Sequence, residues 1–150
     1  MVIRELTTEA SLNLLSRIHL GRLACAKANQ PFVCPIFFAY HENGLYCAST
    51  IGQKIEWMRE NPLVAVEVDE IDSAQQWQSV VVSGRYEEFA DTPEMRDMRQ
   101  LAWSLLQKAH KLWWEPAYVK TILGGAERPM APLYFRIGID RITGHRATKE

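Results

Sequence analysis

Apolar and polar residues alternate along several short stretches of the chain, and a period of two is typical of β-strands. The pattern predicts strands over residues 22–28, 30–40, 45–48, 63–68, 77–89 and 133–139. Turn residues at 27–30 and 41–44 join neighbouring strands as hairpins. About six strands connected in this way predict an antiparallel sheet that closes into a small barrel.

Three stretches have helical spacing instead. Thr7 precedes apolar residues that recur every three or four positions, which predicts a helix from Thr8 to about Ile18. A short helix is predicted over 52–60 and a longer one from Pro93 to 114, with Asp91 or Thr92 as its cap. The fold class is therefore mainly β with flanking helices.

Some finer expectations follow from single residues. Both faces of the stretch 30–40 are apolar, so we expect this strand to be covered on both sides. Pro35 lacks an N–H and marks a place where strand pairing is interrupted, and Gly84 marks a β-bulge. Residues 70–76 are expected to form a polar connection and 120–132 a loop.

The composition narrows the class of protein. A chain of 150 residues is expected to form one domain, 1–150, and its net charge of −1 argues against nucleic acid. No apolar run approaches the roughly 20 residues that cross a bilayer, and no secretory signal is recognisable, so we expect a cytoplasmic protein without a membrane segment. Cys25, Cys34 and Cys47 lack metal-site spacing and are expected to be buried, reduced thiols, with no metal.

Hydrophobic residues make up 47% of the chain and five are tryptophans, which is more than one small core needs. We expect part of this apolar surface, including the methionine-containing stripe of the long predicted helix, to serve a partner subunit or a ligand.

One junction has the residues of an anion site. Ser49 and Thr50 end a predicted strand, Gly52 follows, and Lys54 lies in the first turn of the next helix. Free N–H groups and the dipole of a helix N-terminus favour a phosphate at such a place. The alternative is a Ser/Thr helix cap beside a solvated lysine.

Several blocks together resemble the FMN-binding split-barrel proteins related to pyridoxamine 5′-phosphate oxidase, in particular the nitroimidazole-resistance-like branch. The blocks are residues 20–24 (LGRLA), 31–38 (PFVCPIFF), 45–50 (LYCAST), 52–54 (GQK), 61–64 (NPLV) and 79–84 (SVVVSG). The resemblance implies a six-stranded split barrel and a homodimer that holds two FMN molecules between its subunits.

The resemblance also implies which residues contact FMN. Pro35, Ile36 and Phe37 would line the ring through their backbone. The ribityl chain and the phosphate would be contacted by Ala48, Ser49, Thr50, Gln53 and Lys54, and the other subunit would add Trp77 and Ser79.

In this interpretation the protein is a flavin-dependent oxidoreductase that accepts hydride from NAD(P)H and acts on a small aromatic or quinone-like molecule. No catalytic side chain is identified. Two alternatives stay open: a flavin-binding redox sensor or carrier without turnover, and the same barrel with FAD, F420 or haem in place of FMN.

Overall fold

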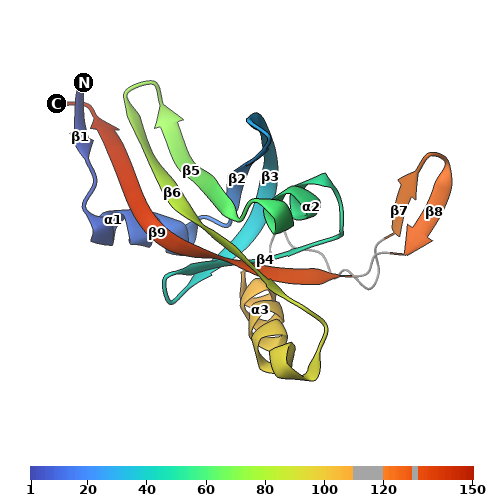
Figure 1. Ribbon diagram of the computed structural model, residues 1–150. Helices are drawn as coiled ribbons and strands as arrows, with labels where there is room; N and C mark the ends of the chain where they lie inside the picture. Colours follow the sequence, from blue (N-terminus) through green and yellow to red (C-terminus); the bar gives the residue numbers. More distant parts are fainter. Residues whose placement is uncertain (110–119, 130–131) are drawn as a thin grey trace.

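A computed structural model describes residues 1–109, 120–129 and 132–150 (Figure 1). The helices are α1 (Thr8–Arg17), α2 (Gln53–Glu60) and α3 (Arg96–Lys108), the last preceded by a 3-10 turn at Pro93–Met95. The strands are β1 (Val2–Glu5), β2 (Leu20–Lys27), β3 (Gln30–His41), β4 (Gly44–Ser49), β5 (Leu63–Ser73), β6 (Gln76–Phe89), β7 (Lys120–Leu123), β8 (Ala126–Pro129) and β9 (Leu133–Thr148).

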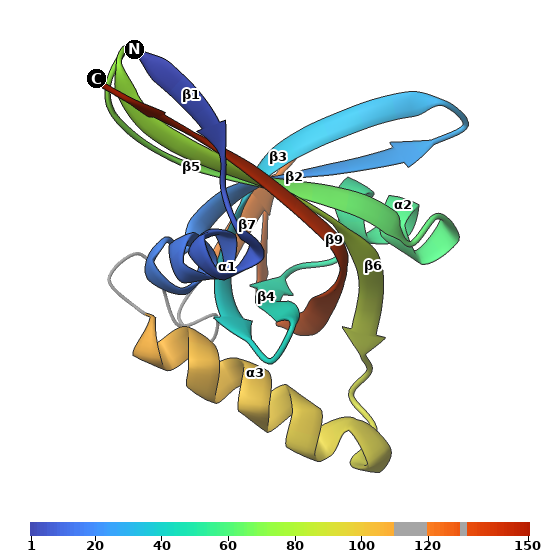
Figure 2. The same cartoon turned by 90° about the vertical axis from the view of Figure 1, so that its left-hand side faces the viewer.

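Six antiparallel strands close into a ring, which confirms the predicted barrel. The order is β9-β4-β3-β2-β5-β6, and β6 pairs again with β9. The first part of β9 pairs with β4 and its last part with β1, while β6 follows the opposite edge of β9 from Trp77 to Phe89. The β5–β6 hairpin and the β1–β9 pair therefore extend beyond the barrel in one direction, and the β2–β3 hairpin extends in another (Figure 2).

The alternation of side chains divides the molecule into an interior and an outer surface. Alternate residues of the strands, such as Val66, Val80 and Val82, fill the barrel together with Leu14 and Leu15 of α1 and Ile55 and Met58 of α2. A second cluster lies outside the barrel, where α3 packs Ala102 and Leu106 against β3, β4, β6 and β9. The three helices thus cover two different sides of the sheet.

Four expectations need correction. The polar segment 70–76 is mostly strand, because β5 continues to Ser73 and only a two-residue turn follows. Residues 120–129 form the β7–β8 hairpin and not a loop. Neither Asp91 nor Thr92 caps a helix through its side chain. The strand 30–40 is covered on both sides only near its end, since Val33 is 62% exposed.

Other expectations hold. Thr7 caps α1, with its hydroxyl accepting from the N–H of Ala10 at 3.1 Å. The long helix was predicted to reach residue 114, but 110–114 lie outside the described residues. Within the described ranges, no helix has the length and apolar composition that a membrane span requires.

The predicted bulge lies opposite Gly84. The β6–β9 register shifts there, so that β9 carries one extra residue, Asp140. A Cβ at Gly84 would collide with the carbonyl oxygen of Gly138 and with the side chain of Ile137. Only a glycine lets β9 approach β6 so closely at the point where the barrel closes.

We therefore expect Gly84→Ala to lower the free energy of unfolding by about 1–3 kcal/mol, because the added methyl group forces the β6–β9 ladder apart. Urea unfolding of the purified protein measures this change. Ser83→Ala, at the exposed neighbouring position, is the control and should stay within about 0.5 kcal/mol of the unmodified protein. Equal stabilities of the two variants would show that the close approach at Gly84 is unimportant.

Candidate functional site

The junction between β4 and α2 is open, as an anion site requires. Gly52 is the N-cap residue of α2, and no described side chain caps the start of the helix by accepting from its first N–H groups. The Ser/Thr cap considered as an alternative is therefore wrong. Ser49 is buried and its hydroxyl donates to the carbonyl of Thr50 at 3.0 Å. A Cβ at Gly52 would meet nothing within 4 Å, so a ligand could approach the backbone there.

Lys54 lies at the start of α2 as a half-buried cation. Among the described residues it forms no hydrogen bond and no ion pair, whereas Lys27 nearby pairs with Glu60 at 3.1 Å. A bound anion would supply the counter-charge that Lys54 lacks among the described residues. The expected phosphate position thus has an available positive charge.

Three free thiols lie within electrostatic reach of Lys54. Cys25 and Cys47 are buried, as predicted, and Cys34 is half-buried. Burial raises the pKa of all three thiols, and the charge of Lys54 opposes this rise. Cys34 and Cys47 belong to β3 and β4, so Lys54 lies close to both strands that carry the predicted flavin contacts.

Strand β3 has an open edge next to this junction. It pairs with β4 only from Phe38 to His41, so residues 30–37 have no partner strand on that side among the described parts of the chain. This confirms that pairing is interrupted around Pro35.

The direction of the free backbone groups follows from the hairpin. Ala28 and Asn29 have φ values of 48° and 63°, as in a type I′ turn, so the flanking residues form a hydrogen-bonded pair. Because such pairs alternate with non-hydrogen-bonded ones, the backbone polar groups of Val33, Pro35 and Phe37 point away from β2 to the open edge. Those of Ile36 point to Gly21 instead, and its side chain is buried.

The remaining predicted residues divide into two groups. Ala48 is half-buried near the end of β4, and Gln53 is exposed at the start of α2. Trp77 and Ser79 lie elsewhere: they pair with Ile71 and Asp69, near the turn of the β5–β6 hairpin. This turn lies away from α2 (Figure 1).

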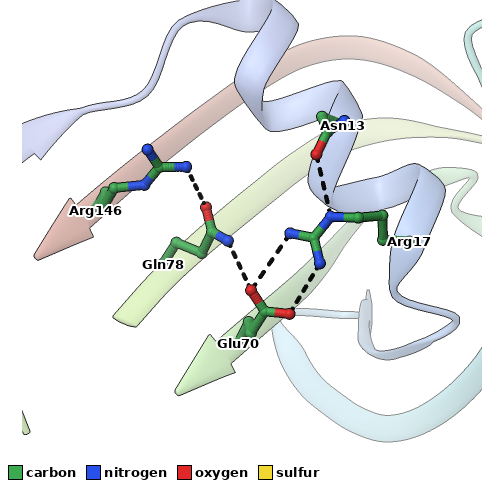
Figure 3. Close-up of polar contacts among 5 residues, drawn as sticks. All are labelled: Asn13, Arg17, Glu70, Gln78 and Arg146. Atoms are coloured by element: carbon green, nitrogen blue, oxygen red, sulfur yellow. Dashed lines mark hydrogen bonds and ion pairs between the residues drawn. The ribbon is translucent and has the colours of Figure 1, made fainter. Parts of the chain in front are cut away.

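A polar network that was not predicted braces the end of the sheet that carries Trp77 and Ser79 (Figure 3). The guanidinium of Arg17 donates to both oxygens of Glu70, at 3.0 and 3.3 Å, and its Nε donates to Asn13 at 3.1 Å. Gln78 donates to Glu70 at 2.9 Å and accepts from Arg146 at 2.9 Å. Helix α1 is thereby tied to β5, β6 and β9.

A cavity of about 170 Å³ adjoins the network, lined by Glu70, Trp77 and Arg146 among others. Hydrogen bonds from Arg17 and Gln78 lower the pKa of Glu70. No sequence signal could have revealed the Arg17–Glu70 pair, because 53 positions separate its members.

Comparison with known proteins is consistent with this geometry. The sequence model of the family described as "Pyridoxamine 5'-phosphate oxidase" matches residues 7–146. An uncharacterized protein of Rhizobium meliloti (strain 1021) is 40% identical over 147 residues, which are 98% of this chain and 97% of that protein.

Two solved structures are similar over nearly the whole chain. An FAD-binding protein from Mesorhizobium loti is 42% identical, with a TM-score of 0.81, over 99% of this chain and 100% of the other. The FAD binding protein from Mycobacterium smegmatis has the same fold at 22% identity and a TM-score of 0.65, over 95% and 98% of the two chains.

The Arg17–Glu70 pair gives a pH-dependent prediction. The pKa of Glu70 is lower in the folded protein than its ordinary value of about 4.5. The contribution of the ion pair to stability is therefore fully present at a pH above 4.5 and is lost as the pH falls through the pKa of Glu70 in the folded protein. Both side chains are partly exposed and solvent screens the pair, so Glu70→Gln should cost only about 0.5–1 kcal/mol at pH 7. Urea unfolding at pH 7 and pH 3 should show a smaller cost at pH 3 than at pH 7.

Glu94→Gln is the matched control, because the exposed Glu94 forms no ion pair among the described residues. It should leave stability unchanged at both pH values. An equal loss for Glu70→Gln at pH 3 and pH 7 would mean that shape, and not charge, is what Glu70 contributes.

Proposed function

The chain belongs to the pyridoxamine 5′-phosphate oxidase family, and from this premise we propose that it is a homodimeric flavoprotein with oxidoreductase activity. The ring of the flavin would lie along the open edge of β3, and its phosphate would lie at the junction of β4 and α2. The observation that carries this proposal is the combination of two features at one place: backbone groups at Pro35 and Phe37, and a cation at Lys54, that have no partner among the described residues.

The open edge of β3 suits the ring of a flavin, and the junction of β4 and α2 suits its phosphate. A flavin ring has polar atoms along one edge and flat apolar faces, and backbone N–H and C=O groups of an open strand can pair with such an edge as they would with another strand. Lys54 and the N–H groups at the start of α2 supply positive charge for a phosphate. Pro35, Phe37 and Ala48 add apolar contact without any charge.

FAD is a stronger candidate than the FMN expected from the sequence, because the Mesorhizobium loti protein that is 42% identical is described as FAD-binding. Both cofactors have a phosphate after the ribityl chain, so the junction at Lys54 would serve either. The adenosine part of FAD would need additional contacts beyond the residues predicted for FMN.

The second subunit of the proposed dimer would supply Trp77 and Ser79 to the flavin site. Within one chain, Trp77 pairs with Ile71 and Ser79 with Asp69, in the half of β5 that lies away from α2, so we expect both to reach a flavin at the α2 junction from another copy. Covering the ring with Trp77 would also exclude water from it.

When bound, the flavin would supply two-electron transfer, and the protein would bind and orient it. The residues at the open edge carry no acid or base, so the chain would act through position and charge. We expect a reduced nicotinamide as the electron donor and a small aromatic or quinone-like acceptor. The same lack of acid–base groups at this edge also suits the second candidate, a redox sensor or carrier without turnover.

A flavin should copurify with the protein. Protein purified under native conditions should be yellow with the absorption bands of a flavin, and chromatography of the released compound should identify FAD or FMN. A Soret band would show that the cofactor is haem and not a flavin. The spectrum of F420 would show that it is a deazaflavin. Anaerobic mixing with NADH and NADPH then separates the two candidates, since bleaching of the flavin by a donor and reoxidation by a quinone indicate turnover.

Lys54 should contribute to flavin binding through the phosphate. Loss of one charge-assisted hydrogen bond to a phosphate costs about 1.5–3 kcal/mol, so Lys54→Ala should weaken flavin binding by roughly one to two decades. Fluorescence titration of the flavin-free protein with FMN and FAD measures the change. Lys27→Ala is the control, because Lys27 lies near the same helix but is neutralised by Glu60. If both variants bind flavin equally well, the phosphate does not bind at this junction.

A further inference from the structure

A small open cavity lies between the last turn of α3 and strand β3, and we call it the α3 cavity. Its volume is about 190 Å³. An engineered protein cavity of about 150 Å³ binds benzene, so the α3 cavity has room for one aromatic ring. The residues that line it are His19, Ala39, Tyr40, Leu105, Lys108 and Ala109.

The backbone polar groups of Tyr40 point away from β4. Glu42 and Asn43 have φ values of 42° and 60°, as in a type I′ turn, so His41 and Gly44 beside the turn form a hydrogen-bonded pair. Hydrogen-bonded and non-hydrogen-bonded pairs alternate along an antiparallel ladder, and Tyr40 belongs to the next pair. Its N–H and C=O are therefore directed to the other edge of β3, on the side of β2.

No strand continues along this edge of β3 beyond Phe38 in the described part of the chain. Strand β2 begins at Leu20, opposite Phe37, and the N–H of Phe38 donates to the carbonyl of His19 at 2.8 Å. Tyr40, two residues further, forms no hydrogen bond to any described residue on this side. Half-buried backbone groups are normally satisfied by protein, water or a ligand, so Tyr40 offers one donor and one acceptor at the cavity.

The imidazole of His19 supplies a further polar atom. Its Nδ1 lies 3.2 Å from the carbonyl oxygen of Phe38. Since a carbonyl oxygen only accepts, Nδ1 carries a proton and donates, which leaves Nε2 as an acceptor when the ring is neutral. The ring also contacts the rings of Phe37 and Phe38, with centroid distances of 6.1 and 6.5 Å. These contacts hold the imidazole in place, and its Nε2 has no partner among the described residues.

A positive charge and apolar surface complete the α3 cavity. Lys108 lies in the last turn of α3 and forms no ion pair within 4.0 Å among the described residues. None of the residues described as lining the cavity is acidic. Ala39 is buried and Leu105 is half-buried, so both offer apolar walls. The cavity therefore combines one positive charge, hydrogen-bonding groups and apolar walls, which is the composition of a small-molecule site.

We propose that the α3 cavity binds a small aromatic carboxylate. The ammonium of Lys108 and the N–H of Tyr40 would donate to the carboxylate, and the ring would lie against Ala39 and Leu105. A hydroxyl group on the ring would donate to Nε2 of His19. The positive charge favours an anion over a neutral ring, and the volume is too small for a flavin.

The α3 cavity and the proposed flavin site lie along opposite edges of β3. The backbone polar groups of Phe37 are directed to the edge beside β4, where the flavin ring would lie, whereas those of Tyr40 are directed to the edge beside β2. The two sites are thus separated by the strand itself. Binding of an aromatic carboxylate is therefore proposed in addition to flavin binding, and neither depends on the other.

Titration of the ¹⁵N-labelled full chain, with its cofactor present, tests the site with three probes: benzoate, acetate and benzyl alcohol. Benzoate should bind with a dissociation constant of about 1 mM or lower and should shift the amide NMR signal of Tyr40. Acetate carries the charge without the ring, and benzyl alcohol carries the ring without the charge. Each of these two should bind at least about tenfold more weakly than benzoate.

Two variants separate the polar groups of the site. Lys108→Gln should weaken benzoate binding about three- to tenfold, since Lys108 is exposed and solvent screens part of its charge. His19→Asn keeps an N–H donor for the carbonyl of Phe38 but removes Nε2, so it should weaken binding of 4-hydroxybenzoate by a similar factor. Arg96→Gln is the matched control, because it removes a positive charge from the first turn of the same helix, about 18 Å from Lys108. It should leave both affinities unchanged.

The proposal is overturned if benzoate at ten times the expected dissociation constant leaves the amide signal of Tyr40 unchanged. It also fails if acetate binds as tightly as benzoate, which would indicate an adventitious anion, or if Lys108→Gln or His19→Asn binds its probe as tightly as Arg96→Gln does. The absorption spectrum of the same sample reports the flavin separately. A flavoprotein that does not bind benzoate would keep the proposed function and lose only this site.

Discussion

The ladder between β6 and β9 is the constraint on which the rest of the structure depends. Every residue from Trp77 to Phe89 pairs with β9, and this pairing closes the ring of six strands. Because successive side chains point to opposite sides, the same register decides which residues fill the barrel and which point away from it. Gly84 permits the one interruption, where Asp140 is accommodated in β9 and the strand can bend around the barrel. A slip of one residue would exchange the interior with the surface.

The sequence predicted the closed part of this fold because its signals are local. Strands buried on one side alternate in polarity, and the turns at 28–29 and 42–43 use residues with positive φ, as two-residue hairpins require. The parts that were missed lack such signals. Strand β1 (Val2–Glu5) is short and mostly exposed, so its pairing with the end of β9 decides its structure. Strand β5 was ended too early because its last residues extend beyond the barrel, where polar side chains are solvated on both sides.

The candidate site was predictable only where it depends on a few neighbouring residues. The open edge at Pro35 follows from the missing N–H of proline, and the exposed junction at Gly52 follows from the change of period between strand and helix. The assignment of Ile36 to the ring came from the resemblance alone, and the alternation of hydrogen bonds in β3 favours Pro35 and Phe37 instead. The network around Glu70 depends on contacts between distant segments, which no local pattern encodes.

The split of the barrel and the open edge of β3 have the same physical origin. Strand β4 is only six residues long, so it leaves the first part of β3 without a neighbour on one side and gives that strand both a free edge and an exposed face. A free edge in water invites aggregation, and an apolar face does so as well. In the proposed function, a flat, polar-edged ligand would satisfy the first, and a second copy would cover the second.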